Sequence, residues 1–194
     1  KRDRYGTTIT RKKTPCKYPA AVAALVEELV KFVRDSLVPK ANGWRYPGNT
    51  VGAPDGPVDL SNTQYALLGL NAAARCGATV PPELYSKVLE YLLATQQKDG
   101  FPTELFVQHA DWEPGAEGVE RWVSAGKRTG RGFPYMPGSQ EGTTGSMTTA
   151  GVACLAIVKE RLGEAGKLTP EVGRRIDAAM LDGIAWLTDV FTVT

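Results

Sequence analysis

The residues best suited to acid–base chemistry lie in one acidic stretch of the chain. It holds the only histidine, His109, with Trp112 and three carboxylates, Asp111, Glu113 and Glu117. Two carboxylates in different environments can hold different pKa values and act as acid and base. A solvated acidic loop accounts for the same residues, because nothing in the sequence fixes their mutual geometry. We expect the solvated loop and keep the acid–base site as the alternative.

Other kinds of reactive site have little support in the sequence. The three cysteines, Cys16, Cys76 and Cys154, lie far apart, without a CxxC pair and with a single histidine in the chain. This pattern signals neither a disulfide framework nor a zinc site. The sequence also contains no Gly-rich phosphate loop, no HExxH and no GxSxG motif. We therefore expect no metal site and no cofactor.

Two Gly- and Pro-rich segments carry aromatic residues that are candidates for ligand binding. Trp44 and Tyr46 lie in the first segment, and Phe133 and Tyr135 lie in the second. Rings at the mouth of a cavity can stabilise a cation through their π faces, by about 0.5–2 kcal/mol each. The equivalent positions of the rings also suit plugs that fill the junctions between helices, and we favour this interpretation.

Five helical segments are predicted to position these residues. Apolar residues recur with helical spacing in the first, and the second is apolar on nearly all faces, which predicts that it is buried. No run of alternating residues indicates a strand, so the predicted fold class is all-α, with a long loop over residues 98–143. The helices are expected from Pro19 to Leu37, from a cap at Asp59 or Ser61 to Gly77, after Pro82, over about Ser146 to Leu162, and from Thr169 onward.

An internal repeat relates two parts of the chain. An offset of 85 residues places Ser61 on Ser146 and Thr63 on Thr148, and an offset of 89 superposes the two aromatic segments. The repeat units span about residues 43–97 and 132–190, and each combines a buried helix with an amphipathic one. Helical repeats bury their apolar faces against neighbouring repeats, which predicts two concentric layers of helices. The chain is thus divided into a basic tail, residues 1–18, and a repeat domain, residues 19–194.

Charge and hydropathy limit the partners that the chain is expected to bind. Residues 1–17 hold seven basic residues and one acidic residue, a net charge of +6, and the remainder carries −4. A basic arm can contact nucleic-acid phosphates, but no recognition fold accompanies this one, so nucleic acid is not an expected partner. The longest apolar stretch, Ala150 to Val158, is far shorter than the roughly 20 residues of a membrane-spanning helix. The sequence does not indicate a compartment.

The repeated pieces resemble the squalene-cyclase and prenyltransferase repeat superfamily, and especially its bacterial repeat-containing proteins of unassigned activity. The resemblance covers residues 19 to 190. It implies an α/α toroid, a partial (α/α)6 barrel whose inner helices surround a central cavity. The matching pieces are Gly43-Trp44-Arg45-Tyr46, the run from Asp59 to Ala66, the run from Gln96 to Phe101, and Gly132-Phe133-Pro134-Tyr135 followed by the run from Ser146 to Ala150.

The chain departs from the catalytic motifs of this superfamily. Squalene–hopene cyclases use a DxDDTA motif whose central Asp protonates the substrate alkene, and the run that begins at Asp59 puts Ser61 at that position. A serine hydroxyl is far too weak an acid for this step. Protein prenyltransferases hold zinc with Asp, Cys and His, whereas His109 lies in the predicted loop. Both sites of the family are therefore expected to be absent.

The first functional hypothesis is a binding module that lacks the family's catalytic motifs. Its inner face would take an apolar or polyprenyl ligand or a protein partner. Ser61, Tyr65 and Ser146 are the candidate binding residues on the inner helices, beside the aromatic residues of the two loops. A structural module of a larger assembly, held by self-association or by another protein, is a further hypothesis.

The competing hypothesis is a divergent terpenoid-cyclase-like enzyme, an isomerase or lyase. It would act on a polyprenyl substrate by acid-initiated carbocation chemistry, with Asp59 as the acid and Tyr65, Trp44 and Tyr135 as cation-stabilising rings. This hypothesis requires Asp59 to project into a closed apolar cavity. An Asp59 side chain that instead caps its helix through backbone N–H groups would argue against it.

Overall fold

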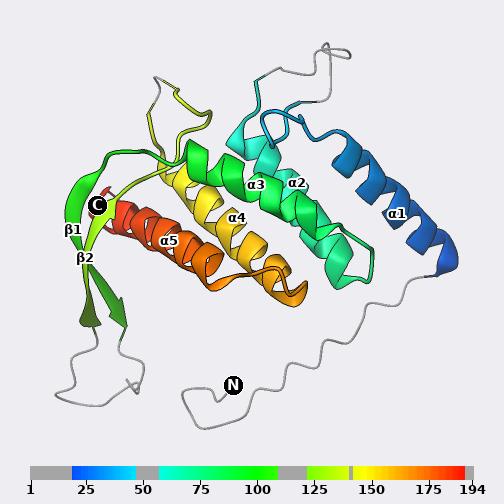
Figure 1. Cartoon of the computed structure of the whole chain (residues 1–194). Coiled ribbons are helices and arrows are strands. Elements are labelled where there is room, and N and C mark those ends of the chain that lie inside the picture. The colour runs from blue at the N-terminus through cyan, green and yellow to red at the C-terminus, as the bar shows by residue number, and fades with distance from the viewer. Residues whose placement is uncertain (1–18, 47–56, 109–121, 140–141, 191–194) are drawn as a thin grey trace, which may run out of the picture.

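The computed structural model describes residues 19–46, 57–108, 122–139 and 142–190 (Figure 1). Within these ranges it contains five helices and one antiparallel pair of strands. The five predicted helices are confirmed, and their starts agree with the expected ones to within a few residues. The elements are α1 (Ala20–Asp35), α2 (Leu60–Arg75), α3 (Pro82–Thr95), β1 (Phe101–Gln108), β2 (Trp122–Gly130), α4 (Gly145–Glu164) and α5 (Pro170–Val190).

The predicted all-α toroid is wrong. The stretch expected to be a long loop contains β1 and β2, which pair antiparallel from Phe101↔Gly130 to Gln108↔Trp122, with an irregularity between Glu104 and Phe106. The two strands pack against α5, and the five helices stand side by side in an open array (Figure 1). The fold is therefore a mixed helix and sheet structure, without a ring of repeats around a cavity.

Alternation of side chains explains why β1 forms a strand. Leu105 is buried and Phe101 is half-buried, whereas Pro102, Glu104 and Phe106 are exposed. This is the period of two expected for a strand with one covered face. Pro102 lacks a backbone N–H, which a two-stranded ribbon tolerates because each strand is an edge strand. The high Gly, Pro and charge content of the segment concealed this pattern in the sequence.

Helix α4 lies at the centre of the packing and contacts α2, α3 and α5. Its buried face includes Cys154, Leu155 and Val158, and these residues join one core cluster with residues of all four other helices. Helix α1 has α2 as its main neighbour and contributes Val30 to the cluster, and it stands at the edge of the array (Figure 1). The core is thus deepest around α4 and thinnest at α1.

The two helices that follow the aromatic segments begin in the same way. Asp59 caps α2 and accepts a hydrogen bond from the N–H of Asn62, and Thr144 caps α4 and accepts one from the N–H of Met147. These caps are separated by the predicted offset of 85 residues. An N-cap side chain satisfies one of the N–H groups that the first helical turn leaves without a partner. The prediction that Asp59 or Ser61 caps α2 is therefore confirmed for Asp59.

The prediction that α2 is buried on all faces is wrong. Leu60, Thr63 and Leu67 are buried, but Tyr65 and Leu68 are exposed. Helix α2 is covered by its neighbours on one side only, so its remaining apolar face meets solvent. The apolar character of a helix does not determine how many neighbours it has.

Glutamines at the end of α3 anchor the strands to the helical layer. The side chain of Gln96 donates to the carbonyl oxygens of Arg131 and Ala179, at 3.0 and 2.9 Å. Gln97 exchanges hydrogen bonds with Gly132, through its backbone N–H and through its side-chain oxygen. These bonds join the end of α3, the exit of β2 and α5, and they give the two glutamines a structural role.

An ion pair completes this junction. The guanidinium of Arg131 donates to one carboxylate oxygen of Asp182 on α5, with Nε and Nη2 at 2.9 and 2.6 Å. The backbone N–H of Arg131 also donates to the backbone carbonyl of Asp182, at 3.1 Å. Asp182 is buried and is paired directly, as buried charges in proteins normally are.

Candidate functional site

The side chain of Asp59 is engaged at the start of α2. Its two carboxylate oxygens accept hydrogen bonds from the backbone N–H and the side-chain amide of Asn62, at 2.7 and 2.8 Å. Its backbone N–H donates to the carbonyl of Trp44, at 3.1 Å. Asp59 is buried, so these bonds fix both its backbone and its side chain. This is the capping geometry that argues against the terpenoid-cyclase hypothesis.

Two tyrosines from the aromatic segments meet at this cap. Burial raises the pKa of the Tyr135 hydroxyl. The pKa is raised further by the charges of Asp59 and Tyr46 and by side-chain hydrogen bonds with both residues. The backbone carbonyl of Tyr135 accepts the N–H of Leu60, at 2.9 Å. The structure thus brings Asp59, Tyr46 and Tyr135 together, and their polar groups hold the second aromatic segment against the start of α2.

Trp44 and Phe133, which the sequence also marks as ligand-binding candidates, are buried in the core. The N–H of Trp44 donates to the hydroxyl of Thr63, at 3.1 Å, and the N–H of Phe133 donates to the hydroxyl of Thr148, at 3.0 Å. The indole of Trp44 also donates to the carbonyl of Val33 on α1, at 2.7 Å. The two rings therefore fill space between helices, which is the role that the sequence favours for them.

The remaining predicted binding residues lie at the surface. Ser61 is half-buried in the first turn of α2, and Ser146 is exposed in the first turn of α4, with its hydroxyl 3.2 Å from that of Thr144. Tyr65 stands out because its side chain is 71% exposed on a helix that otherwise packs in the core.

A further candidate surface, which the sequence did not reveal, is a row of exposed apolar side chains on α1. On α1, Leu25, Leu29 and Phe32 are 54%, 54% and 60% exposed, and Val22 is exposed as well. Their spacing of three, four and three residues places them on one side of the helix. The helical spacing in the sequence puts seven residues on one apolar stripe: Val22, Leu25, Val26, Leu29, Val30, Val33 and Leu37. Val26, Val30, Val33 and Leu37 belong to the core or pack against it, whereas Val22, Leu25 and Leu29 are exposed.

Helices α1 and α2 are neighbours, and each carries exposed apolar side chains. The indole bond from Trp44 to Val33 ties the end of α1 to the segment before α2, and Glu27 accepts the N–H of Thr79 after α2, so the helices are antiparallel. The exposed apolar side chains of these two neighbouring helices form the candidate surface. We call this surface the α1–α2 face: Val22, Leu25, Leu29, Phe32, Tyr65 and Leu68.

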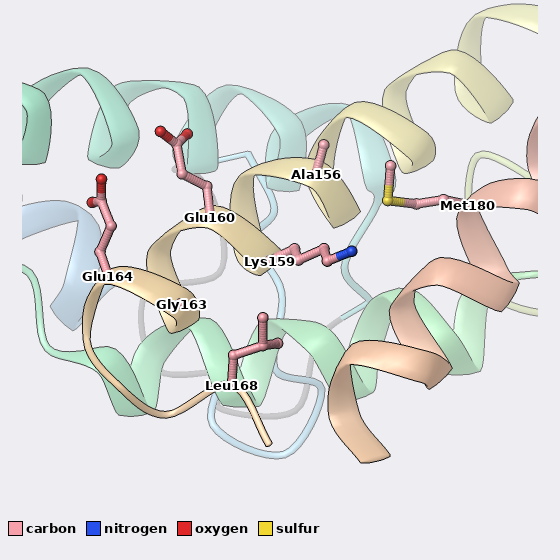
Figure 2. A pocket seen from close by; sticks show the side chains of 7 residues that line it. All are labelled: Ala156, Lys159, Glu160, Gly163, Glu164, Leu168 and Met180. Atoms are coloured by element: carbon pink, nitrogen blue, oxygen red, sulfur yellow. The ribbon is translucent and has the colours of Figure 1, made fainter. Parts of the chain in front are cut away.

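A shallow pocket of about 500 Å³ lies between the end of α4 and α5 (Figure 2). Leu168 and Met180 give it apolar walls. Its charged residues are already engaged by the protein: Lys159 is paired with Asp177 of α5, and Glu164 is paired with Arg161 at 2.8 Å. Pairing of these charges leaves the pocket without a distinctive group for recognition. It is a weaker candidate than the α1–α2 face.

The acidic stretch, the metal site and the membrane span can be compared with the structure only over the described residues. The acidic stretch with His109, Asp111, Trp112, Glu113 and Glu117 lies outside those residues. Within residues 19–46, 57–108, 122–139 and 142–190, no group of three or more His, Cys, Asp or Glu side chains is placed to hold a metal ion. None of the helices in these ranges has the length and apolar character needed to cross a membrane.

No family model, no curated protein and no solved structure matches this chain. The resemblance to squalene-cyclase and prenyltransferase repeats stays a prediction from the sequence. The geometry of the described residues is therefore the basis for a functional proposal, and within it the α1–α2 face is the strongest candidate site.

Proposed function

We propose that this chain is a protein-binding module that receives its partner on the α1–α2 face. The observation that carries the proposal is the exposure of Leu25, Leu29 and Phe32, three large apolar side chains on one side of α1. A single exposed apolar residue is ordinary in a folded protein, but a contiguous apolar surface marks an interaction site. Tyr65 and Leu68 extend the surface onto α2.

The shape of the face favours a protein partner over a small molecule. From Val22 to Phe32 the exposed stripe is about 15 Å long, at 1.5 Å per residue. Small ligands prefer concave sites that enclose most of their surface. An apolar helical stripe instead offers an extended surface of the kind on which amphipathic peptide segments dock.

A displayed library of peptide segments tests the proposal. The folded protein is used to select binders, and each binder is then measured against Leu29→Glu and Phe32→Glu variants. A charge at the centre of an apolar interface removes its favourable burial, so both variants should reduce binding by tenfold or more, about 1.4 kcal/mol in free energy. Circular dichroism checks that the variants remain folded.

Phe106→Glu is the matched control, because Phe106 is an exposed aromatic residue on β1, away from the face. Binding by this variant should equal that of the unmodified protein. Selected segments whose binding is insensitive to changes at Leu29 and Phe32, or an exhaustive library that yields no binder, would contradict the proposal.

A further inference from the structure

We propose that the partner of the α1–α2 face is an amphipathic helix whose outer edge carries Lys or Arg. This inference rests on the proposed function and adds to it the conformation and the charge of the bound segment. It follows from two features of the face: the spacing of its apolar residues and the charges along its outer border.

The spacing on α1 matches the seam of a helix pair. Val22, Leu25, Leu29 and Phe32 repeat at intervals of three, four and three residues, as the a and d positions of a heptad do. Those positions form knobs and holes for a second helix that lies nearly parallel or antiparallel to the first. Because all four are exposed, α1 presents a complete seam that no described part of the chain covers.

Helix α2 adds two exposed apolar residues to the α1–α2 face. These are Tyr65 and Leu68, on the main neighbour of α1. A helix seated between two helices buries apolar residues on both flanks of its own stripe. An extended strand would leave its backbone N–H and C=O groups facing these apolar side chains without partners, which is unfavourable. The face therefore fits a helix better than a strand.

The border of the seam on the side away from α2 carries two carboxylates. Glu28 and Asp35 are seven residues apart, are both exposed, and follow Leu25 and Phe32 by three residues each, at positions equivalent to g of the heptad. Lys31 and Arg34 lie farther round α1, and Arg34 donates to the Asp35 carboxylate at 2.8 Å. The outer edge of a docked helix would thus meet the carboxylate of Glu28 and that of Asp35, which Arg34 also pairs.

This border also disfavours a second copy of the chain as the occupant. If two α1 helices paired antiparallel through the seam, the g positions of the two copies would face each other, and Glu28 would approach Glu28 of the second copy. Like charges at such positions are destabilising. A Lys- or Arg-edged helix gains the opposite interaction at the same place.

Two synthetic helical peptides of about three heptads test the inference. Both carry leucine at a and d, and they differ only in one edge, which is lysine in the first and glutamate in the second. We expect the lysine-edged peptide to bind about fivefold more tightly at low ionic strength, as two exposed charge pairs allow. The preference should disappear near 1 M salt, where the Debye length is about 3 Å.

A charge-reversal variant provides the decisive comparison. Glu28→Lys combined with Asp35→Lys should invert the preference between the two peptides. Glu83→Lys combined with Glu171→Lys is the matched control, because it changes the net charge equally at exposed positions on α3 and α5. This control should leave the preference unchanged.

The outcomes separate this inference from the proposed function. If the two peptides bind equally, or if the charge reversal does not invert the preference, the proposal that the partner carries Lys or Arg on its outer edge is wrong. If neither helical peptide binds while library segments of another conformation bind at Leu29 and Phe32, the helical partner is wrong and the protein-binding function stands. If light scattering shows a dimer that Leu29→Glu dissociates, a second copy occupies the face. If no probe binds there, both proposals fail.

Discussion

The ring of Phe133 lies directly against Gly151 of α4. A Cβ added at Gly151 would approach the Phe133 Cγ to 2.5 Å, closer than side-chain atoms pack. Phe133 is completely buried, and its N–H is held by the hydroxyl of Thr148, one turn earlier on α4. The ring therefore has no room to withdraw, and the glycine is required by space and not by its backbone conformation.

Replacement of Gly151 by alanine should lower the free energy of unfolding by about 1–3 kcal/mol, the usual cost of overpacking a core. The gain in helix propensity, at most about 1 kcal/mol, offsets only part of this loss. Gly69→Ala is the control: a Cβ at Gly69 on α2 meets no atom within 4 Å, so this variant should be stabilised. Urea unfolding measures both. An unchanged or higher stability of Gly151→Ala would show that Phe133 can move.

The two threonines that hold the aromatic segments should be equally sensitive to loss of their hydroxyls. Thr63→Val and Thr148→Val leave the buried N–H groups of Trp44 and Phe133 without an acceptor. An unsatisfied buried polar group costs about 1–3 kcal/mol. Serine at either position keeps the hydroxyl and should recover most of the stability.

Chemical denaturation of the four variants checks this expectation. A loss at Thr148 with none at Thr63 would mean that the two segments are not held in equivalent ways. A loss for serine with none for valine would instead assign the effect to packing of the methyl group, which valine keeps and serine lacks.

Local sequence signals account for the parts of the fold that could be predicted. Helical periodicity and terminal residues placed all five helices, since a cap such as Asp59 or a first-turn proline such as Pro82 acts within a few residues. The Gly- and Pro-rich segments and the cap position also singled out Tyr46, Tyr135 and Asp59, which the structure does bring together. Of the four aromatic residues in the two segments, the buried ones are Trp44 and Phe133, whose N–H groups donate to the hydroxyls of Thr63 and Thr148.

Tertiary packing decides the parts that could not be predicted. The strand β1 has an alternating pattern around Leu105, but it pairs with a segment that begins fourteen residues after its end. On α1, the sequence shows a single broad apolar stripe. Helix α1 is covered on one side only, so Val30, which points to that side, is buried and Leu29 is exposed. The sequence does not show how many helices cover α1. The α1–α2 face is invisible in the sequence for this reason.

Two buried tyrosines should make the protein sensitive to alkali. Burial raises the pKa of Tyr85 on α3 to about 12, and it raises the pKa of Tyr91 to about 12 as well. Because the folded state disfavours the charged phenolate, their contribution is fully present below the unfolded pKa of about 10 and is lost as pH rises toward 12. Stability should therefore fall over this range.

Absorbance of the phenolate and circular dichroism, recorded together from pH 9 to 12.5, test this expectation. A Tyr85→Phe variant removes one of the two groups, so its stability should fall less steeply with pH. Titration of all tyrosines near pH 10 in the folded protein would contradict the burial of these hydroxyls.

Asp59 should act as a helix cap and not as an acid. Asp59→Ala removes the acceptor for the N–H of Asn62 and should cost about 0.5–2 kcal/mol of stability. Asp59→Asn keeps a side-chain oxygen at the cap and should cost much less, because asparagine caps helices about as well as aspartate. The two variants therefore separate loss of the cap from loss of the charge, and thermal unfolding measures the difference. If Asn and Ala were equally destabilising, the carboxylate charge, through its contact with Tyr135, would be the important property of Asp59.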